Sequence, residues 1–264
     1  MPAHDDRTRR ERVRVTTAES EQRVPATHRF AGIDALRGFA VAQMIVYHFI
    51  YDLNYFHWLH MKMTIDQPWI GWRTAIVTQF LLLVGASLVL RGAFKPFWSD
   101  FWRRWVQIAG AAALVSAGSW WMFRDKFIYF GILHYIAVAL VLARLLVPLG
   151  RLNIALGVVA LLTGLLFKDA VFNPTDLNWL GFVTRRPVTE DYVPIFPWIG
   201  VTLIGVGLGA LWQRSGFAVS PAVQRLNSAP PRLFVFLGSW ALTVYLLHQP
   251  IMLGVLWVVR ALTG

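Results

Sequence analysis

Four ionisable residues lie inside apolar stretches of the sequence, where such side chains are costly and therefore usually functional. They are His48 and Asp52 in the first stretch, His134 in a later one and His248 in the last. His48 and Asp52 are four residues apart, so on a helix they share one face. The carboxylate is expected to orient one ring nitrogen and to raise the basicity of the other. This chemistry is that of a general base or an acyl acceptor.

The three histidines are predicted to lie at a similar depth in a membrane. From the flanking basic residues, His48 and His248 lie about 16 and 24 Å above the inner boundary, and His134 about 12 Å below the outer one. In an apolar core of about 30 Å, all three fall between the midplane and the outer face. We therefore expect one layer of imidazoles, although each histidine alone would also serve as a polar contact between helices.

A metal site is a weaker alternative for the same residues. Three histidines and one aspartate have the right donor atoms for zinc. Their spacing follows no metal-ligand motif, and they come from distant segments. No metal is expected. The absence of cysteine removes thiol nucleophiles and Cys-based metal sites,.

Transmembrane helices are the elements that must position these residues. The chain of 264 residues is 56% hydrophobic and only 15% charged, whereas a soluble domain carries about 25% charged residues. Its apolar stretches repeatedly approach the roughly 20 residues that cross a bilayer. We predict an all-α polytopic membrane bundle of about seven helices, the last interrupted at Pro250. The predicted spans are Leu36–Tyr55, Trp69–Leu90, Trp105–Phe123, Phe127–Pro148, the short Ile154–Phe167, Val193–Trp212 and Leu233–Val259.

The net charge of +11 is distributed over short loops between the apolar stretches. With the N-terminus inside, 17 of the 25 Lys and Arg residues fall on the inner side, as the positive-inside rule requires. This pattern predicts a multi-pass protein of a bacterial inner membrane with a cytoplasmic N-terminus, and no nucleic-acid partner. Residues 1–28 are predicted to be a disordered basic tail, and residues 29–264 the membrane domain. Without the short fifth span, the C-terminal half would have the opposite orientation.

Two rims of the predicted bundle carry further candidates. Basic side chains at the inner rim would suit a phosphorylated cosubstrate, although the inside rule predicts the same residues. At the outer rim, Pro194 and Pro197 loosen the start of the sixth span, as occurs where backbone lines a cavity. The cosubstrate candidates are Arg37, Arg91, Lys95, Arg103 and Arg104; the outer candidates are Asp191 and Trp198 for substrate, and His57 and His60 as interfacial anchors or part of a substrate mouth.

Several sequence blocks resemble the catalytic-domain family of heparan-alpha-glucosaminide N-acetyltransferase, in a short bacterial form. The resemblance covers roughly residues 29–255. The more specific blocks open and close it, and the middle ones are mainly hydrophobic pattern. The blocks are Asp34-Ala35-Leu36-Arg37-Gly38, Val46–Phe49, Tyr51–Phe56, Phe80–Gly85, Phe130–His134, Pro194–Gly209 and Tyr245-Leu246-Leu247-His248-Gln249-Pro250.

The resemblance implies a transmembrane acyltransferase that moves an acetyl group from cytosolic acetyl-CoA to an acceptor across the membrane. In lysosomal members the acceptor is the terminal glucosamine of heparan sulfate, and the catalytic histidine follows the first helix of the domain. That segment holds both His57 and His60 here, whereas His48 lies earlier. The chain lacks a large lumenal domain, so a bacterial envelope sugar or lipid-linked glycan is the expected acceptor. Gln249 is a candidate substrate-binding residue.

A transporter or flippase is the alternative function, with the histidines and Asp52 relaying protons. It would predict inverted repeats, and the sequence shows no convincing internal symmetry. Membrane lipids are expected partners in either case, and a homodimer is possible for both.

Overall fold

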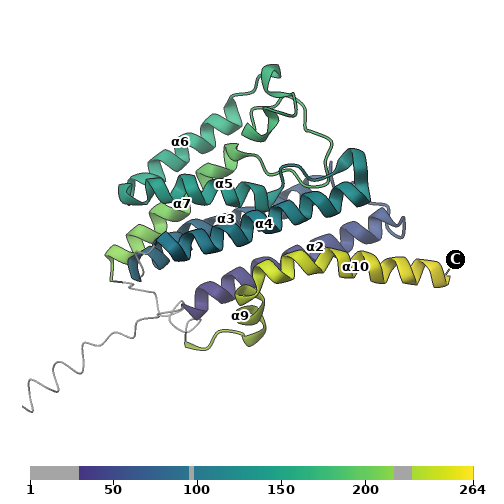
Figure 1. Ribbon diagram of the computed structural model, residues 1–264, viewed down its shortest axis with the longest axis horizontal. Coiled ribbons are helices and arrows are strands. Elements are labelled where there is room, and N and C mark those ends of the chain that lie inside the picture. The colour runs from purple at the N-terminus through teal and green to yellow at the C-terminus, as the bar shows by residue number, and fades with distance from the viewer. Residues whose placement is uncertain (1–29, 95–97, 217–227, 264) are drawn as a thin grey trace, which may run out of the picture.

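The computed structural model describes residues 30–94, 98–216 and 228–263 of the chain. Over these ranges it is helical and contains no strand, which confirms the predicted helical bundle (Figure 1). The predicted tail 1–28 and Lys95 lie outside the described residues. The main helices are α2 (Ala31–Tyr55), α3 (Gln67–Phe94), α4 (Trp98–Phe123), α5 (Ile132–Leu146), α6 (Leu152–Leu166), α7 (Ile195–Arg214), α9 (Arg232–Ser239) and α10 (Ala241–Thr263). Single 3-10 turns are Arg124–Lys126, Val147–Leu149, Ala170–Phe172 and Asn178–Leu180.

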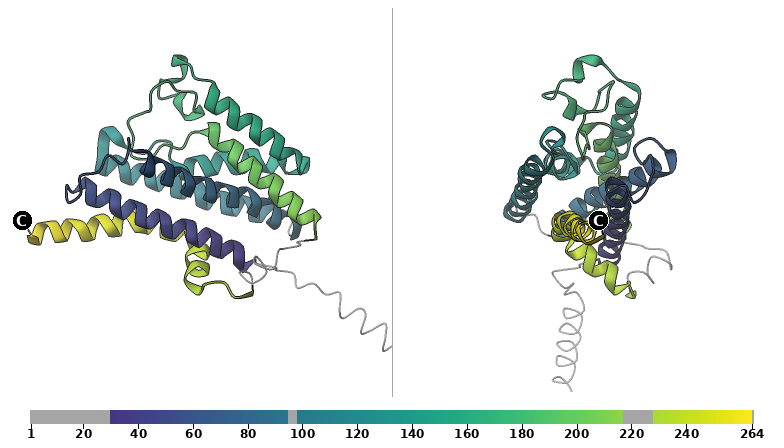
Figure 2. Two further views of the ribbon diagram at one scale, coloured as in Figure 1. Left: turned by 180° about the vertical axis from the view of Figure 1, so that it is seen from behind. Right: turned by 90° about the vertical axis from the view of Figure 1, so that its right-hand side faces the viewer.

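Six of the described helices are long and apolar enough to cross a membrane, namely α2, α3, α4, α5 with its following turn, α7 and α10. The predicted fifth span corresponds to α6, an apolar helix of 15 residues. That length covers about 22 Å, which is less than the apolar core of a typical bilayer. α6 nevertheless runs beside α7 (Figure 2). The start of α2 and the end of α10 lie at opposite ends of the bundle (Figure 1). An odd number of passes, with α6 as the seventh, agrees with this arrangement.

Glycine residues let α7 pack closely against α3 on one side and α6 on the other. A Cβ atom on Gly85 of α3 would collide with the backbone oxygen of Thr202 in α7. A Cβ atom on Gly157 of α6 would lie 2.6 Å from the backbone oxygen of Gly200, also in α7. Small residues are the usual means of bringing helix backbones together in lipid, where apolar side chains gain little by burial. α7 is therefore the central helix of this half of the bundle.

The last predicted span breaks at a different residue from the one expected. α9 ends at Ser239 and α10 begins at Ala241, whereas Pro250 lies inside a continuous helix. Pro250 removes one backbone donor, but helices in membranes tolerate this loss through local adjustment. The break at Trp240 follows a close contact with α2, because a Cβ atom on Gly238 of α9 would collide with the backbone of Asp34. The chain turns after this contact, and α10 then follows α2 toward its end.

The irregular start predicted for the sixth span is present in α7. Phe196 has an extended conformation inside the helix, with φ −96° and ψ 137°. Trp198, which follows it, is partly buried and packs against the main hydrophobic core. That core gathers residues from α3, α4, α5 and α7, and among its fully buried side chains are Leu81 and Tyr135. It supports the helix ends that carry the candidate site.

Candidate functional site

Two helices that are distant in sequence, α2 and α10, lie side by side (Figure 1). They bring four polar side chains together. The rings of His48 on α2 and His248 on α10 have centroids 5.0 Å apart. The Gln249 side-chain Nε2 donates a hydrogen bond of 2.8 Å to Oδ1 of Asp52. We call these four residues the α2–α10 polar cluster. It contains three of the four ionisable residues singled out from the sequence.

Both histidines of the α2–α10 polar cluster are oriented by backbone carbonyl groups. His48 Nδ1 lies 2.9 Å from the Met44 carbonyl oxygen, and His248 Nδ1 lies 2.6 Å from that of Tyr245. A carbonyl oxygen only accepts hydrogen bonds, so each neutral ring carries its proton on Nδ1. The Nε2 atom of each ring therefore presents a lone pair. A lone pair of this kind is what a general base or a nucleophilic histidine requires.

Three buried polar atoms in the same cluster have no partner among the described residues. They are Oδ2 of Asp52, Oε1 of Gln249 and Nε2 of His248. Asp52 itself is only 1% exposed. Buried polar atoms are nearly always hydrogen-bonded in folded proteins, so three such atoms in one place indicate a site for a ligand or water. All three accept hydrogen bonds when the carboxyl is ionised, and they match a ligand rich in N–H or O–H groups.

The structure corrects the expected relation between His48 and Asp52. The carboxylate does not orient the imidazole, because Oδ1 of Asp52 accepts from Gln249 and Oδ2 has no partner. The orienting group for His48 is the carbonyl of Met44, one helical turn earlier. The i and i+4 spacing places both side chains on one face, as expected, but the neighbouring helix supplies the partner of the carboxylate.

His134 is not part of the α2–α10 polar cluster, so of the three histidines expected in one layer only His48 and His248 are in ring contact. Its Nδ1 accepts from the backbone N–H of Gly131 at 3.3 Å, and its Nε2 lies 3.0 Å from Oγ of Ser116. The Ser116 hydroxyl in turn donates to the carbonyl of Ile128 at 2.6 Å. Nδ1 thus closes the first turn of α5, and Nε2 links that turn to α4. This arrangement suits a structural histidine.

Asp191 lies at the beginning of α5, in the loop before α7. Its Oδ2 accepts a 2.8 Å hydrogen bond from the backbone N–H of Ile132. Burial raises the pKa of the Asp191 carboxyl above its usual value, although this hydrogen bond and the positive charge of Arg73 act in the opposite direction. The same loop reaches the first helix, because Tyr51 Oη donates to Oε2 of Glu190 at 3.1 Å. Neither Tyr51 nor Glu190 was a candidate from the sequence; the position of Tyr51 beside Asp52 was the available signal.

The substitution Asp191→Asn is expected to flatten the pH dependence of thermal stability in detergent. A carboxyl whose pKa is raised by folding adds stability at low pH and loses it as the pH rises through the folded pKa. Asparagine keeps an acceptor for the Ile132 N–H and carries no charge, so the variant should equal or exceed the parent in Tm near neutral pH. Tm measured from about pH 4 to 8 tests this, with the exposed Asp176→Asn as control. A variant Tm that falls further below the parent as the pH rises would contradict the expectation.

The remaining outer candidates lie on the surface that follows α2. His57 and His60 are both exposed, and His57 has a positive φ of 63°. Asn54 orders this turn by accepting the backbone N–H of Met61 at 2.7 Å. Neither imidazole has a hydrogen bond to the α2–α10 polar cluster. A catalytic role for His57 or His60 stays a prediction.

The predicted cosubstrate residues separate into one buried and several exposed side chains. Arg37 is 8% exposed and forms a 2.7 Å salt bridge with Asp34. It also donates to Oγ of Ser87 at 2.7 Å, which ties α2 to α3. Arg103 and Arg104 are exposed at the start of α4, and Arg91 is exposed near the end of α3. A cosubstrate role for the exposed arginines at this end of the bundle stays a prediction.

Arg37→Ala is therefore expected to act on stability rather than on cosubstrate affinity. It would leave Asp34 buried without this cation, a change that typically costs about 3–5 kcal/mol. Arg103→Ala, at an exposed side chain near the start of α4, should keep the parent Tm and raise KM for the acyl donor. Thermal unfolding and steady-state kinetics on the two purified proteins separate these effects. A stable Arg37→Ala protein with a raised KM would instead assign Arg37 to the cosubstrate.

The helices and the family comparison converge on the same part of the chain. The six long apolar helices make this a membrane-embedded protein. Among the described residues, no group of three or more His, Asp or Glu side chains is arranged to hold a metal ion. Searches for similar curated proteins and for similar solved structures found no match. The family described as "Heparan-alpha-glucosaminide N-acetyltransferase, catalytic" matches residues 29–250, which include the whole α2–α10 polar cluster. The chain belongs to this family of transmembrane acetyltransferases.

Proposed function

We propose that the protein transfers an acetyl group from cytosolic acetyl-CoA to the amine of a glycan at the outer face of a bacterial inner membrane. The observation that carries this proposal is the α2–α10 polar cluster, where two imidazole rings lie 5.0 Å apart and Gln249 binds the buried carboxylate of Asp52. The family match supports acetyl transfer. The acceptor class is inferred from the chemistry of the cluster.

The unpartnered atoms of the cluster favour an amine acceptor. A primary ammonium group offers three N–H donors, and Asp52 Oδ2, Gln249 Oε1 and His248 Nε2 are three buried acceptors without partners. The negative charge of Asp52 would balance the positive charge of the ammonium before proton transfer. A hydroxyl offers a single donor and would leave two of these atoms unsatisfied. N-acetylation is therefore the better match.

His48 is our choice for the base that acts on this amine. One of the three N–H groups would turn from His248 to the Nε2 lone pair of His48, whose ring lies beside that of His248. His48 would accept this proton, and the neutral amine would attack the thioester carbonyl. The C–N bond forms, the C–S bond breaks, and CoA leaves as the thiolate that takes up a proton. In the covalent alternative, Nε2 itself attacks the carbonyl, and the amine then removes the acetyl group from the imidazole.

Acetyl-CoA would approach from the end of the bundle where α2 begins, opposite to the outer face proposed for the acceptor. Exposed arginines of α3 and α4 at that end suit the phosphates of CoA, and this end is cytoplasmic if the positive-inside rule holds. Along α2, the distance from Arg37 at this end to His48 is about 16 Å. An acetyl group carried on the long arm of CoA would cover this distance while the phosphates stay at the surface. This geometry lets an anion that cannot cross the membrane deliver its acetyl group into the bilayer.

The direct test uses purified protein in detergent with radiolabelled acetyl-CoA and glucosamine. Formation of labelled N-acetylglucosamine is the expected result. Label retained on the protein after acid quenching, in the absence of acceptor, would indicate the covalent route. If acetyl-CoA neither binds nor transfers its label, the proposal is wrong. Proton-coupled uptake into proteoliposomes without acetyl-CoA would then favour the transporter alternative.

A further inference from the structure

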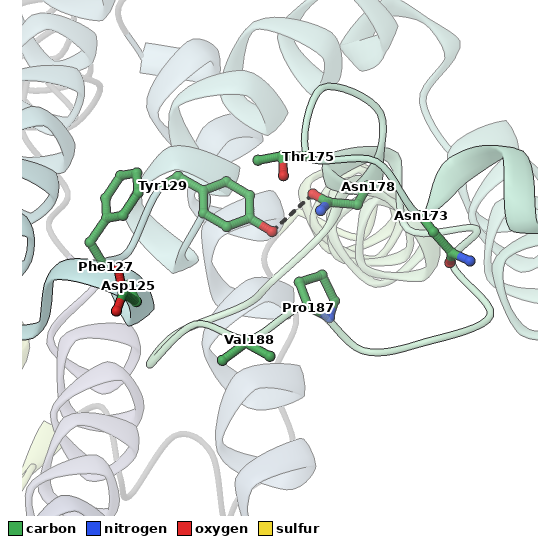
Figure 3. Close-up of a pocket in the computed structure, with 8 residues that line it drawn as sticks. All are labelled: Asp125, Phe127, Tyr129, Asn173, Thr175, Asn178, Pro187 and Val188. Atoms are coloured by element: carbon green, nitrogen blue, oxygen red, sulfur yellow. Dashed lines mark hydrogen bonds between the residues drawn. The ribbon is translucent and has the colours of Figure 1, made fainter.

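A polar pocket opens at the end of the bundle where α4 ends and α7 begins (Figure 3). It lies between residues 125–129, which precede α5, and the loop 173–188 between α6 and α7. Its volume is about 360 Å³, which is within the range of small-molecule sites, about 300–1,000 Å³. No residue of the α2–α10 polar cluster lines it, so its lining has to be explained apart from acetyl transfer.

Two aromatic rings form one corner of this pocket. Phe127 has an extended backbone, with φ −58° and ψ 156°, and side chains two residues apart on an extended chain point the same way. Phe127 and Tyr129 both line the pocket, with ring centroids 5.9 Å apart and ring planes at 61°. Trp120 packs edge-on against Phe127 at 4.9 Å and supports that ring. The face of an aromatic ring attracts a cation, and several rings together are the usual surface for a quaternary ammonium group.

A carboxylate lies beside the aromatic corner. Asp125 belongs to the 3-10 turn directly before Phe127, and it lines the same pocket. Its side chain forms no hydrogen bond or ion pair with any residue that the structure describes. Its neighbours Arg124 and Lys126 do not line the pocket, and the guanidinium carbon of Arg124 lies 5.9 Å from the centroid of the Trp120 ring. A carboxylate next to aromatic rings favours a cationic ligand and disfavours an anion.

The side of the pocket across from Asp125 holds a buried donor (Figure 3). Asn178 is only 2% exposed, and its Oδ1 accepts a 3.0 Å hydrogen bond from Tyr129 Oη. This bond fixes the amide, which leaves Nδ2 as its free end. Nδ2 has no hydrogen-bond partner within the described part of the chain. Buried polar groups in folded proteins are nearly always hydrogen-bonded, so Asn178 indicates a ligand that brings an oxygen acceptor into the pocket.

Hydrogen bonds hold both walls of the pocket in place. The Thr189 hydroxyl donates to the carbonyl of Phe127 at 2.8 Å, which joins the loop before α7 to the aromatic corner. Within the loop, Asn173 Nδ2 donates to Oγ1 of Thr184 at 2.8 Å, and Asn173 Oδ1 accepts from the Thr184 backbone N–H at 3.0 Å. The cation corner and the amide donor are therefore held in position before a ligand arrives, which lowers the entropy cost of binding.

We infer that this pocket binds a small organic ammonium ion that also carries an oxygen acceptor, as choline does. The ammonium group lies in the corner of Phe127 and Tyr129 beside Asp125, and the ligand oxygen accepts from Asn178 Nδ2. The same chemistry occurs in free choline and in the headgroup of phosphatidylcholine, where a phosphate oxygen is the acceptor. The inference does not depend on the proposed function, because choline has no N–H group and is no substrate for N-acetylation.

Equilibrium binding of radiolabelled choline to the purified protein in detergent tests the inference. We expect saturable binding, and the neutral alcohol in which a tert-butyl group replaces the trimethylammonium group should compete about tenfold less well. Asp125→Asn should weaken choline binding about tenfold, because it removes the charge and keeps the size of the side chain. Asp176→Asn is the matched control, because Asp176 is exposed in the loop and does not line the pocket. Phe127→Leu, which removes one ring, is a second variant that should weaken binding.

Three results would overturn the inference: no saturable choline binding by the parent, equal competition by the neutral alcohol, or equal affinities of Asp125→Asn and Asp176→Asn for choline. Nanodiscs distinguish the two sources of the ligand. If the headgroup of a lipid fills the pocket, free choline should bind in phosphatidylglycerol nanodiscs and not in phosphatidylcholine nanodiscs. Equal choline binding in both would support the site and assign it to a free ammonium compound. Tm in detergent checks that each variant is folded.

Discussion

His48→Ala is expected to lower the rate of acetyl transfer by about 10²–10⁴-fold, the usual contribution of a general base. The substitution removes the Nε2 lone pair that faces the α2–α10 polar cluster, while the Met44 carbonyl that orients the ring remains in place. The side chain is only partly buried, so the protein should still fold. The measurement is kcat for N-acetylglucosamine formation from acetyl-CoA, with Tm in detergent as the check on folding.

The same measurement decides between the three histidines near the end of α2. His57→Ala and His60→Ala are matched controls, because both side chains are exposed in the turn that follows α2. Both variants should retain transfer close to the parent rate. If His57→Ala or His60→Ala abolishes transfer while His48→Ala leaves it intact, the base lies in that turn. The resemblance to the lysosomal members implies a catalytic histidine in that turn, so the three variants decide between His48 and the turn.

Gly85→Ala is expected to cost more stability than any single methyl group added elsewhere in α3 or α4. The new Cβ would collide with the backbone oxygen of Thr202, and backbone atoms of a central helix have no alternative position. Overpacking of this kind typically costs about 1–3 kcal/mol, and separation of α3 from α7 would also loosen the main core. Thermal unfolding of the purified protein in one detergent gives the difference in Tm.

Gly118→Ala in α4 is the control for helix propensity. No atom lies within 4 Å of a Cβ built on Gly118, so alanine should be neutral or should stabilise the helix, by up to about 1 kcal/mol. A Gly85→Ala protein with the Tm of Gly118→Ala would show that α3 and α7 are not as close as described. Transfer activity measured on both variants would then separate packing from catalysis.

The transmembrane elements could be predicted because hydropathy is a local property of the sequence. A run of about 20 apolar residues must cross a bilayer as a helix, since no other local structure satisfies its backbone in lipid. The predicted span Val193–Trp212 accordingly coincides with α7 (Ile195–Arg214) to within two residues at each end. Local patterns were less informative where packing decides. The break is at Trp240 rather than at Pro250, next to Gly238, which contacts α2 about 200 residues earlier in the chain.

The sequence by itself determined that the chain is a helical membrane protein, and it marked His48, Asp52 and His248 as costly residues that need a reason to be in a membrane. Which of them meet was decided by the rotation and pairing of helices. Those depend on contacts between distant segments, such as the 2.8 Å hydrogen bond from Gln249 to Asp52. The same contacts placed His134 at a helix start and Arg37 in a buried salt bridge. The depth of a residue in the membrane follows from counting residues along its own helix. Which neighbour its side chain contacts depends on how that helix is rotated about its axis relative to the adjacent helices.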